Sequence, residues 1–387
     1  MLPKTEPASA EPASAPAPAP APDATAPAPS PLPDQSVPAP IPAPRSTPEN
    51  EHRYDIDVMR LVASCAVILG HVSATFLTAV DREESNGRSA YWIGHIGDAI
   101  NQFAVPMFFA MAGWAVLMGA PPRNSSRMWQ RIRRNGVPLF VWTGAYLVWT
   151  WLRDRNDKPM TDLSVDALFG TVQPAYHLWF LYAYIPIIMA LAFITLIRVG
   201  QRPWSLGIAL VAIAGLPQAL PTIGEVTGWQ PPPVTWSFGT YSVVYAAAGA
   251  LLFSLPGGLS PRYRKLMVPL FLLSAVGVLW YDTQIHYPIA NAHPFTAVMT
   301  GALLLGVSRI RVPERWRPNL GKLAAAAMGA YMVHVFLVEE IVMRIVTEDV
   351  GPVDGSLLLI AMVLMTCVLS YGASLLWGRL GLRRFLG

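Results

Sequence analysis

The chain has 387 residues, of which 53% are hydrophobic and 13% are charged, and its formal net charge is +4. About a quarter of the residues of a soluble domain are charged, so this composition excludes an ordinary soluble domain and indicates a polytopic membrane protein. Cys65 and Cys367 both lie in apolar stretches, which excludes a disulfide framework and a cysteine-rich metal site. We expect membrane lipid around the chain and no nucleic-acid partner.

The N-terminal segment differs in composition from the rest of the chain. Residues 1–50 hold 16 of the 37 prolines, interleaved with alanine and serine, and contain no apolar run that fits a signal peptide. Such a composition is typical of a disordered, partly polyproline II segment. We expect a disordered Pro/Ala-rich cytoplasmic tail over 1–50 that acts as a spacer, with a docking ligand as the alternative, and a membrane domain over 51–387.

Apolar segments recur through the whole membrane domain. Their lengths and spacing predict an all-α fold, a polytopic transmembrane helical bundle of about ten spans. The predicted spans cover residues 58–80, 99–118, 137–152, 177–197, 204–220, 238–255, 266–282, 291–308, 323–346 and 355–377.

The basic residues are distributed unevenly between the connections of these spans. Those on the side of the two termini hold 18 arginines and lysines, whereas the opposite connections and span ends hold six. Cytoplasmic loops carry such an excess of basic residues. We therefore expect a multi-pass protein of the inner or plasma membrane with both termini in the cytoplasm.

A narrow polar stripe runs along the first predicted span. On a helix, one arc of about 60° contains six polar side chains: Asp57, Arg60, Ser64, His71, Thr75 and Thr78. At 1.5 Å per residue, His71 lies roughly 16 Å beyond Arg60, near the middle of a hydrocarbon layer about 30 Å thick. An ionisable side chain there costs about 2.5–3.5 kcal/mol, so it usually marks a pathway or an active site.

Structural explanations exist for the same residues. His71 is alternatively a histidine that is hydrogen-bonded to a neighbouring helix, and Arg60 an anchor whose side chain reaches the interface. Asp57 lies one turn before Arg60 and is placed to pair with it. The continuity of the stripe favours the functional interpretation.

Five motifs, in order along the chain, resemble those of the acyltransferase 3 family, integral membrane proteins that transfer acyl groups from a coenzyme A thioester to hydroxyl groups. They are Asp57-x-x-Arg60-x10-His71, the segment 105–113, the basic loop with Arg131, Arg133 and Arg134, the run His177-Leu178-Trp179-Phe180-Leu181, and Tyr331-Met332-Val333-His334. Ala104 and Ala112 depart from the glycine and serine that are usual in the second motif, so we expect no polar role there. The resemblance makes 51–387 a membrane acyltransferase domain.

The resemblance implies an enzyme that uses acetyl-CoA or another short acyl-CoA as co-substrate and has no bound cofactor. The nucleotide end of the donor is expected at the basic loop, on Arg127, Arg131, Arg133 and Arg134. His71 is the expected general base, with a covalent acyl-imidazole as the competing mechanism, and Arg60 and Asp57 complete the catalytic group. The expected substrate contacts are His177, Trp179, Tyr331 and His334, with Trp179 alternatively an interfacial belt residue.

The resemblance also implies that the acceptor is a hydroxyl of a carbohydrate, such as a surface polysaccharide or lipid-linked glycan, or of a macrolide-type metabolite. A proton-coupled transporter that uses the Arg60/His71 stripe as a relay is the alternative function; a non-catalytic sensor or anchor leaves the stripe unexplained.

Other ionisable residues have simpler expected roles. Asp282, Glu339 and Glu340 lie toward the ends of spans, where solvation explains them. His95, His286 and His293 lie in or beside connections without zinc-like spacing, so we expect no metal site.

Overall fold

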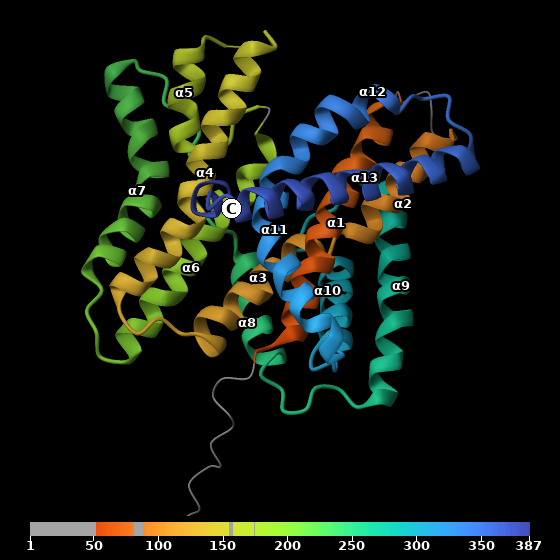
Figure 1. Ribbon diagram of the computed structural model, residues 1–387. Coiled ribbons are helices and arrows are strands. Elements are labelled where there is room, and N and C mark those ends of the chain that lie inside the picture. The colour runs from red at the N-terminus through yellow and green to blue at the C-terminus, as the bar shows by residue number, and fades with distance from the viewer. Residues whose placement is uncertain (1–51, 81–87, 155–157, 174) are drawn as a thin grey trace, which may run out of the picture. The chain divides into compact units, whose positions relative to one another are not determined.

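The structure, a computed structural model, describes residues 52–80, 88–154, 158–173 and 175–387. Within these ranges all the regular secondary structure is helical (Figure 1), which confirms the predicted all-α fold. The expected Pro/Ala-rich tail over 1–50 lies outside the described residues.

The helices follow one another with short connections. The first half contains α1 Tyr54–Thr78, α2 Ser89–Asn101, α3 Ala104–Trp114, the π-helix η1 Ala115–Gly119, α4 Ser125–Leu152, α5 Met160–Phe169, the 3₁₀ turn η2 Tyr176–Leu178 and α6 Trp179–Arg198. The second half contains α7 Trp204–Thr227, α8 Thr240–Leu252, α9 Pro261–Gln284, α10 Pro294–Val307, η3 Glu314–Trp316, α11 Arg317–Leu337, the π-helix η4 Val338–Val342, α12 Met343–Ile345, α13 Pro352–Arg379 and α14 Arg383–Leu386.

Among the described residues, six helices are long and apolar enough to cross a membrane, or seven if α7, which bends by 48° near its prolines, is counted as one span. The six are 54–78, 89–119, 176–198, 261–284, 314–345 and 352–379. Each of the ten predicted spans overlaps a helix, but α8 and α10 are short apolar helices and α4 is not among the candidates. The count of ten spans is therefore not confirmed.

Proline marks the start of several of these helices. Pro261 and Pro294 occupy the first turn of α9 and α10, and Pro318 and Pro352 the first turn of α11 and α13. The first turn has no intrahelical partner for its N–H groups, and the fixed φ of proline already suits a helix. Local sequence thus sets these boundaries.

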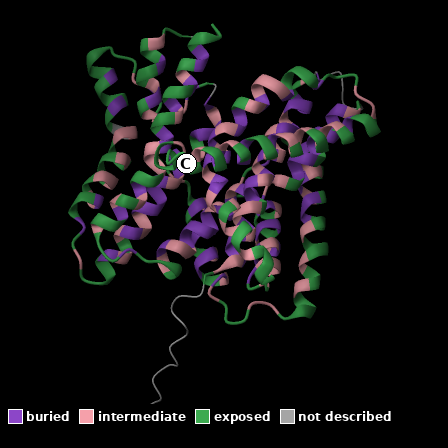
Figure 2. Ribbon diagram, in the orientation of Figure 1, coloured by how far each residue is buried: buried purple, intermediate pink, exposed green. Residues whose placement is uncertain are grey.

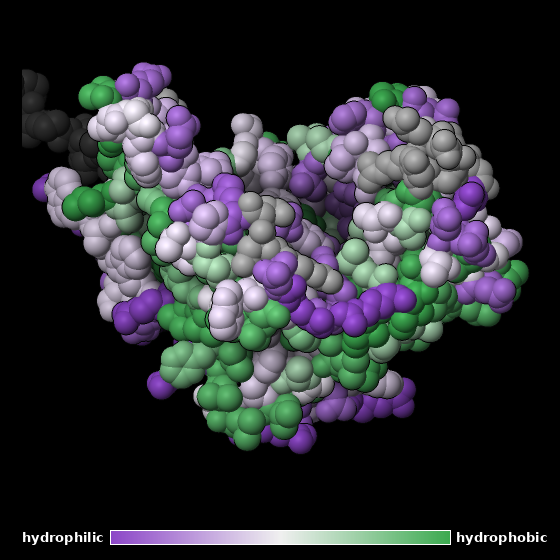
Figure 3. Space-filling model, turned by 90° about the horizontal axis from the view of Figure 1, so that it is seen from above, coloured by the Kyte–Doolittle hydropathy of each residue, from purple (hydrophilic) through white to green (hydrophobic). Residues whose placement is uncertain are grey.

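Helix α1 occupies the centre of the packing. It contacts α2, α3, α11 and α13, and half of its most apolar window is buried, against 22% for α9 and 17% for α13 (Figure 2). The exposed residues of α9 and α13 include many leucines and valines, and broad hydrophobic areas show in green beside the hydrophilic patches in Figure 3. The polar stripe of α1 therefore faces other helices, whereas α9 and α13 offer apolar surface to lipid.

Helices α3 and α8 approach each other through glycines. A Cβ atom on Gly113 would lie 2.0 Å from the carbonyl oxygen of Ala246, and one on Gly249 would lie 2.0 Å from the carbonyl oxygen of Ala110. Only glycine permits the two backbones to be this close, as in small-residue packing of membrane helices.

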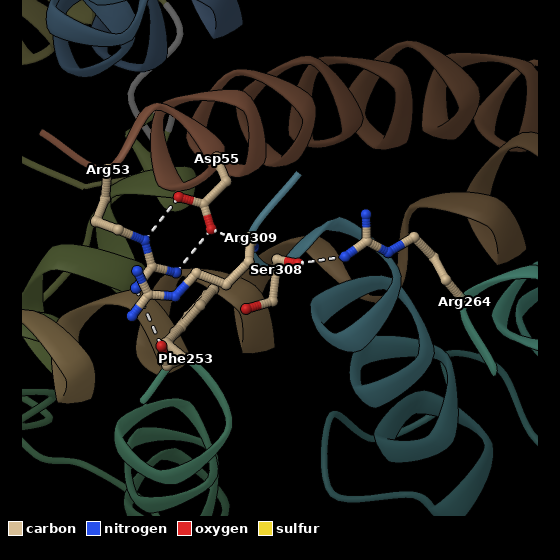
Figure 4. A network of polar contacts seen from close by, with 6 residues as sticks. All are labelled: Arg53, Asp55, Phe253, Arg264, Ser308 and Arg309. Atoms are coloured by element: carbon tan, nitrogen blue, oxygen red, sulfur yellow. Dashed lines mark hydrogen bonds and ion pairs between the residues drawn. The ribbon is translucent and has the colours of Figure 1, made fainter. Parts of the chain in front are cut away.

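A polar network fixes the start of α1 (Figure 4). Arg53 donates to both carboxylate oxygens of Asp55 at 2.8 and 2.7 Å and to the carbonyl oxygen of Phe253 at 3.0 Å, just beyond α8. The backbone N–H of Arg309, after α10, donates to Asp55 at 2.7 Å. Since Asp55 is buried, its bidentate partner and its backbone donor offset the cost of its charge and tie α1 to two other helices.

Replacing Gly113 by alanine is expected to destabilise the protein by about 1–3 kcal/mol or more, because the added methyl group overlaps the α8 backbone. Thermal unfolding of the purified protein in detergent measures this as a lower midpoint. The matched control is Gly372→Ala in α13, where nothing lies within 4 Å and alanine is the better helix former. Equal midpoints for the two variants would contradict the close α3–α8 contact.

Candidate functional site

Three histidines from distant parts of the sequence lie together inside the bundle. His71 comes from α1, His177 from η2 at the start of α6, and His334 from α11. Their ring centroids are 5.0 Å apart for His71 and His334, 5.3 Å for His177 and His334, and 6.4 Å for His71 and His177. At such separations in an apolar interior, repulsion keeps more than one ring from carrying a charge. We call these three residues the histidine cluster.

Tyrosines and backbone carbonyls surround the histidine cluster. The Tyr176 hydroxyl lies 3.4 Å from Nδ1 of His71. His334 Nδ1 lies 2.6 Å from the carbonyl oxygen of Tyr331, and since a carbonyl only accepts, this nitrogen carries the proton and donates. The Tyr331 hydroxyl in turn donates to the carbonyl oxygen of His177. These contacts orient the rings without any charged partner.

Parts of the cluster lack hydrogen-bond partners within the described ranges. Both ring nitrogens of His177 and Nε2 of His334 are buried without one. Buried polar atoms are nearly always paired, so such exceptions require an explanation. Other buried side-chain atoms of the described residues share this condition, but His177 also lines a cavity, where a polar ligand or water can pair with it.

A cavity of about 180 Å³ reaches His71 and His177. Its remaining lining is mostly apolar and aromatic and comes from α1, α3, α4, α6 and α11: Arg60, Val67, Val105, Phe108, Asn135, Trp179, Phe180, Leu181, Tyr184, Ala327, Met328 and Tyr331. His334 does not line this cavity; it contacts His71 and His177 instead. We call this space the inner cavity.

A second cavity of about 1130 Å³ adjoins the inner cavity, since Arg60, Asn135 and Met328 line both. Five arginines line it, namely Arg60, Arg133, Arg134, Arg383 and Arg384, and no aspartate or glutamate does. We call it the arginine-lined cavity. A small apolar space holding imidazoles thus adjoins a larger cationic space, where anions concentrate.

Arg60 stands between the two cavities and is held in place. Its guanidinium donates to Asp57 at 3.1 Å, and Asp57 also lies 2.5 Å from Nε2 of His52. Asp57 is buried, whereas 41% of the Arg60 side chain is exposed. The carboxylate therefore directs an accessible guanidinium toward the boundary of the cavities.

The structure does not bring every predicted site residue to these cavities. Arg133 and Arg134 line the arginine-lined cavity, but Arg127 and Arg131 line neither cavity. Arg131 donates to the carbonyl oxygen of Ala120, and Arg127 is exposed. Residues 131 and 134 lie only about 60° apart around α4, so helix geometry does not separate them; the hydrogen bond to Ala120 engages the Arg131 side chain outside the cavity.

Several expectations for the remaining ionisable groups were wrong. Asp282 is buried and accepts from the Ile289 N–H at 2.8 Å, so it is not solvated. Glu340 accepts from Trp149 at 3.0 Å and from Arg344 at 2.6 Å, and also from Arg153. His95 is buried in α2 between Tyr91 and Tyr287 rather than in a connection. The described residues form no cluster suited to a metal ion.

Sequence reasoning missed residues that the structure brings to the histidine cluster or to the cavities. Tyr176 directly precedes the motif residue His177, and Asn135 follows Arg134. Neighbours of motif residues were therefore the available signal for these two. Arg383 and Arg384 lie about 250 residues from the basic loop, and no local pattern connects them to it.

A cysteine placed in the inner cavity is expected to react with a small anionic thiosulfonate reagent. In a background of Cys65→Ala and Cys367→Ala, Val67→Cys lines the cavity, whereas the control Val72→Cys on the same helix is fully buried. Because access limits thiol modification, we expect labelling of Val67→Cys to be about tenfold faster or more. The labelling rates are measured by mass spectrometry of the intact protein. Equal rates for the two cysteine variants would show that the cavity is closed to solutes.

Comparison with known families gives one result. Residues 53–375 match the model of a family described as an acyltransferase domain, acyltransferase 3. Comparisons with curated proteins and with solved structures gave no match.

Proposed function

Since the chain belongs to the acyltransferase 3 family and is a multi-pass membrane protein, we propose that it transfers an acetyl or other short acyl group from acyl-CoA to a hydroxyl group. His71 acts as the general base. The observation that carries the proposal is that the inner cavity at His71 and the arginine-lined cavity adjoin each other and share Arg60, Asn135 and Met328.

The donor enters from the arginine-lined cavity. The nucleotide end of acyl-CoA carries several negative charges, and guanidinium groups bind phosphates through charge-assisted hydrogen bonds. With Arg133 and Arg134 at the nucleotide and Arg60 at the boundary, the pantetheine arm extends past Asn135 and Met328 into the inner cavity. The thioester then lies beside His71.

This arrangement fits a cytoplasmic donor. The excess of basic residues on one side of the predicted spans supports a cytoplasmic location of both termini and of the arginine-lined cavity. The inner or plasma membrane is therefore the proposed location.

His71 accepts the proton in the transfer step. The Tyr176 hydroxyl lies 3.4 Å from Nδ1 of His71, and we assign the ring proton to Nδ1, which leaves Nε2 of the neutral ring as the base. Nε2 takes the acceptor's hydroxyl proton as that oxygen bonds to the thioester carbonyl carbon. The tetrahedral intermediate collapses, the carbon–sulfur bond breaks, and the thiolate recovers the proton from His71 as free CoA.

The choice of His71 over the other two imidazoles rests on access. His71 is partly exposed to the cavity, while His177 and His334 are fully buried. His177 lines the cavity and serves as a substrate contact; His334 supports the other two rings. A covalent acyl-imidazole remains the competing mechanism, and it predicts labelled protein when radiolabelled acetyl-CoA is added without acceptor.

The acceptor side is aromatic. Trp179, Phe180 and Tyr184 line the inner cavity with Tyr331, and aromatic faces suit the apolar face of a sugar ring or of a macrolide while hydroxyl groups fix its orientation. We propose a carbohydrate hydroxyl, on a surface polysaccharide or a lipid-linked glycan, or a hydroxyl of a macrolide-type metabolite. The family match disfavours the transporter alternative.

The His71→Gln variant is expected to lose about 10²- to 10⁴-fold in kcat, the usual contribution of a positioned base, with binding of acyl-CoA unchanged. The measurement is release of free CoA from acetyl-CoA by purified protein in detergent with a panel of sugars and macrolides as acceptors. The matched control is His286→Gln at an exposed position, with wild-type turnover expected. Near-normal turnover by His71→Gln would contradict the role as base, and no acceptor-dependent release by the wild-type protein would contradict acyl-CoA-dependent transfer.

A further inference from the structure

Two of the arginines in the arginine-lined cavity belong to the last helix of the described chain. Arg383 and Arg384 begin α14, Arg383–Leu386, and line the same cavity as the α4 residues Arg133 and Arg134. In Figure 1 this end of the chain lies in front of the bundle, beside α4, and α14 packs on α4.

The position of α14 is fixed by contacts with three helices. The chain turns after α13 at Gly381, whose φ of +74° is in the left-handed region that favours glycine, and the Leu382 N–H donates to the carbonyl oxygen of Trp377 at 3.0 Å. Arg383 donates to the carbonyl oxygen of Ala325 in α11. Trp142 of α4 donates to the carbonyl oxygen of Leu386 at 3.2 Å. The arginines of α14 are therefore held at the cavity.

These cations lack counter-charges. Within the described residues, the four arginines of α4 and α14 that line the cavity form no ion pair with a carboxylate, and the Arg384 guanidinium lies 4.5 Å from the ring centroid of its neighbour Phe385. All four are exposed, so water screens part of their mutual repulsion, and a bound anion lowers it further. A ligand with several negative charges resolves this repulsion.

We propose that Arg383 and Arg384 bind phosphate groups of the donor nucleotide, so that α14 forms the second wall of the donor site. The inference rests on the proposed function. Arg133 and Arg134 of α4 and Arg384 of α14 together bind a diphosphate or the 3′-phosphate of CoA. Arg384 is the principal contact, since one Arg383 nitrogen is already engaged with Ala325.

An anionic lipid headgroup offers the same phosphate chemistry. The adjacent groove, lined by Arg311, Lys322, Arg379 and also Arg383, shares no lining residue with the inner cavity. The arginine-lined cavity does share three, including Arg60. Because the arginine-lined cavity adjoins the inner cavity, it favours the nucleotide donor over lipid. Arg384 lines the arginine-lined cavity and not the adjacent groove, so a substitution of Arg384 tests the first site alone.

The experiment measures binding of desulfo-CoA, which lacks the reactive thiol, by isothermal titration to protein in nanodiscs of neutral phosphatidylcholine. We expect Arg384→Gln to raise the Kd about tenfold or more, because a charge-assisted contact is lost, while Arg384→Lys recovers part of the affinity. Arg379→Gln, a basic residue of the adjacent groove, is the matched control and is expected to keep the wild-type Kd. With acetyl-CoA, Arg384→Gln is expected to raise KM and leave kcat near the wild-type value.

The outcomes are distinguishable. Tight binding of desulfo-CoA by both the wild-type protein and Arg384→Gln would overturn the role of α14 and leave the proposed function standing. Absence of binding to the wild-type protein would contradict the proposed function itself. A third outcome has two parts. Nanodiscs of phosphatidylglycerol would abolish desulfo-CoA binding by the wild-type protein and by Arg384→Gln, and the two proteins would have equal Kd values in neutral nanodiscs. In that case the arginines bind lipid headgroups and the proposal fails.

Discussion

The structure of this protein depends on polar side chains that must contact one another inside an apolar helical bundle. His71, His177 and His334 satisfy this requirement only because α1, the start of α6 and α11 meet at one point. None of the three rings has a carboxylate beside it within the described contacts, so the cluster is favourable while it is largely neutral. A neutral imidazole is the form that accepts a proton, which connects the packing constraint directly to the proposed acyl transfer.

The position of α1 in turn relies on contacts at its start and on the packing of the helices beside it. Near its start, the buried Asp55 pairs with Arg53 and receives the Arg309 N–H, which joins α1 to the ends of α8 and α10. Beside α1, two glycines allow α3 and α8 to pack closely against each other. Buried ion pairs contribute little net stability but are costly to break, so this network acts mainly to hold α1 in one register and thereby to set the height of His71.

The two cavities divide the proposed reaction by charge. The arginine-lined cavity is cationic and wide, which suits a nucleotide, and the inner cavity is small and mostly apolar, which suits a thioester and its acyl group. Arg60 lies at the boundary, oriented by Asp57. In the proposed reaction, the nucleotide phosphates and the reacting carbonyl lie in different cavities. The phosphate charges then stay at a distance from His71, and the apolar inner cavity limits water near the thioester.

The sequence by itself determined the helical fold, the polar stripe of α1 and the family motifs that include His71, His177 and His334. These depend on hydropathy and on the period of 3.6 residues, which are local properties of the chain. Only the tertiary structure decided that His334 lies behind the inner cavity, that Arg127 and Arg131 face elsewhere, and that Arg383 and Arg384 join Arg133 and Arg134. The number of spans was likewise beyond the sequence, because hydropathy marks apolar segments without telling a lipid-facing span from a short helix buried against protein. Contacts between segments 250 residues apart arise from helix packing, which no pattern within one helix records.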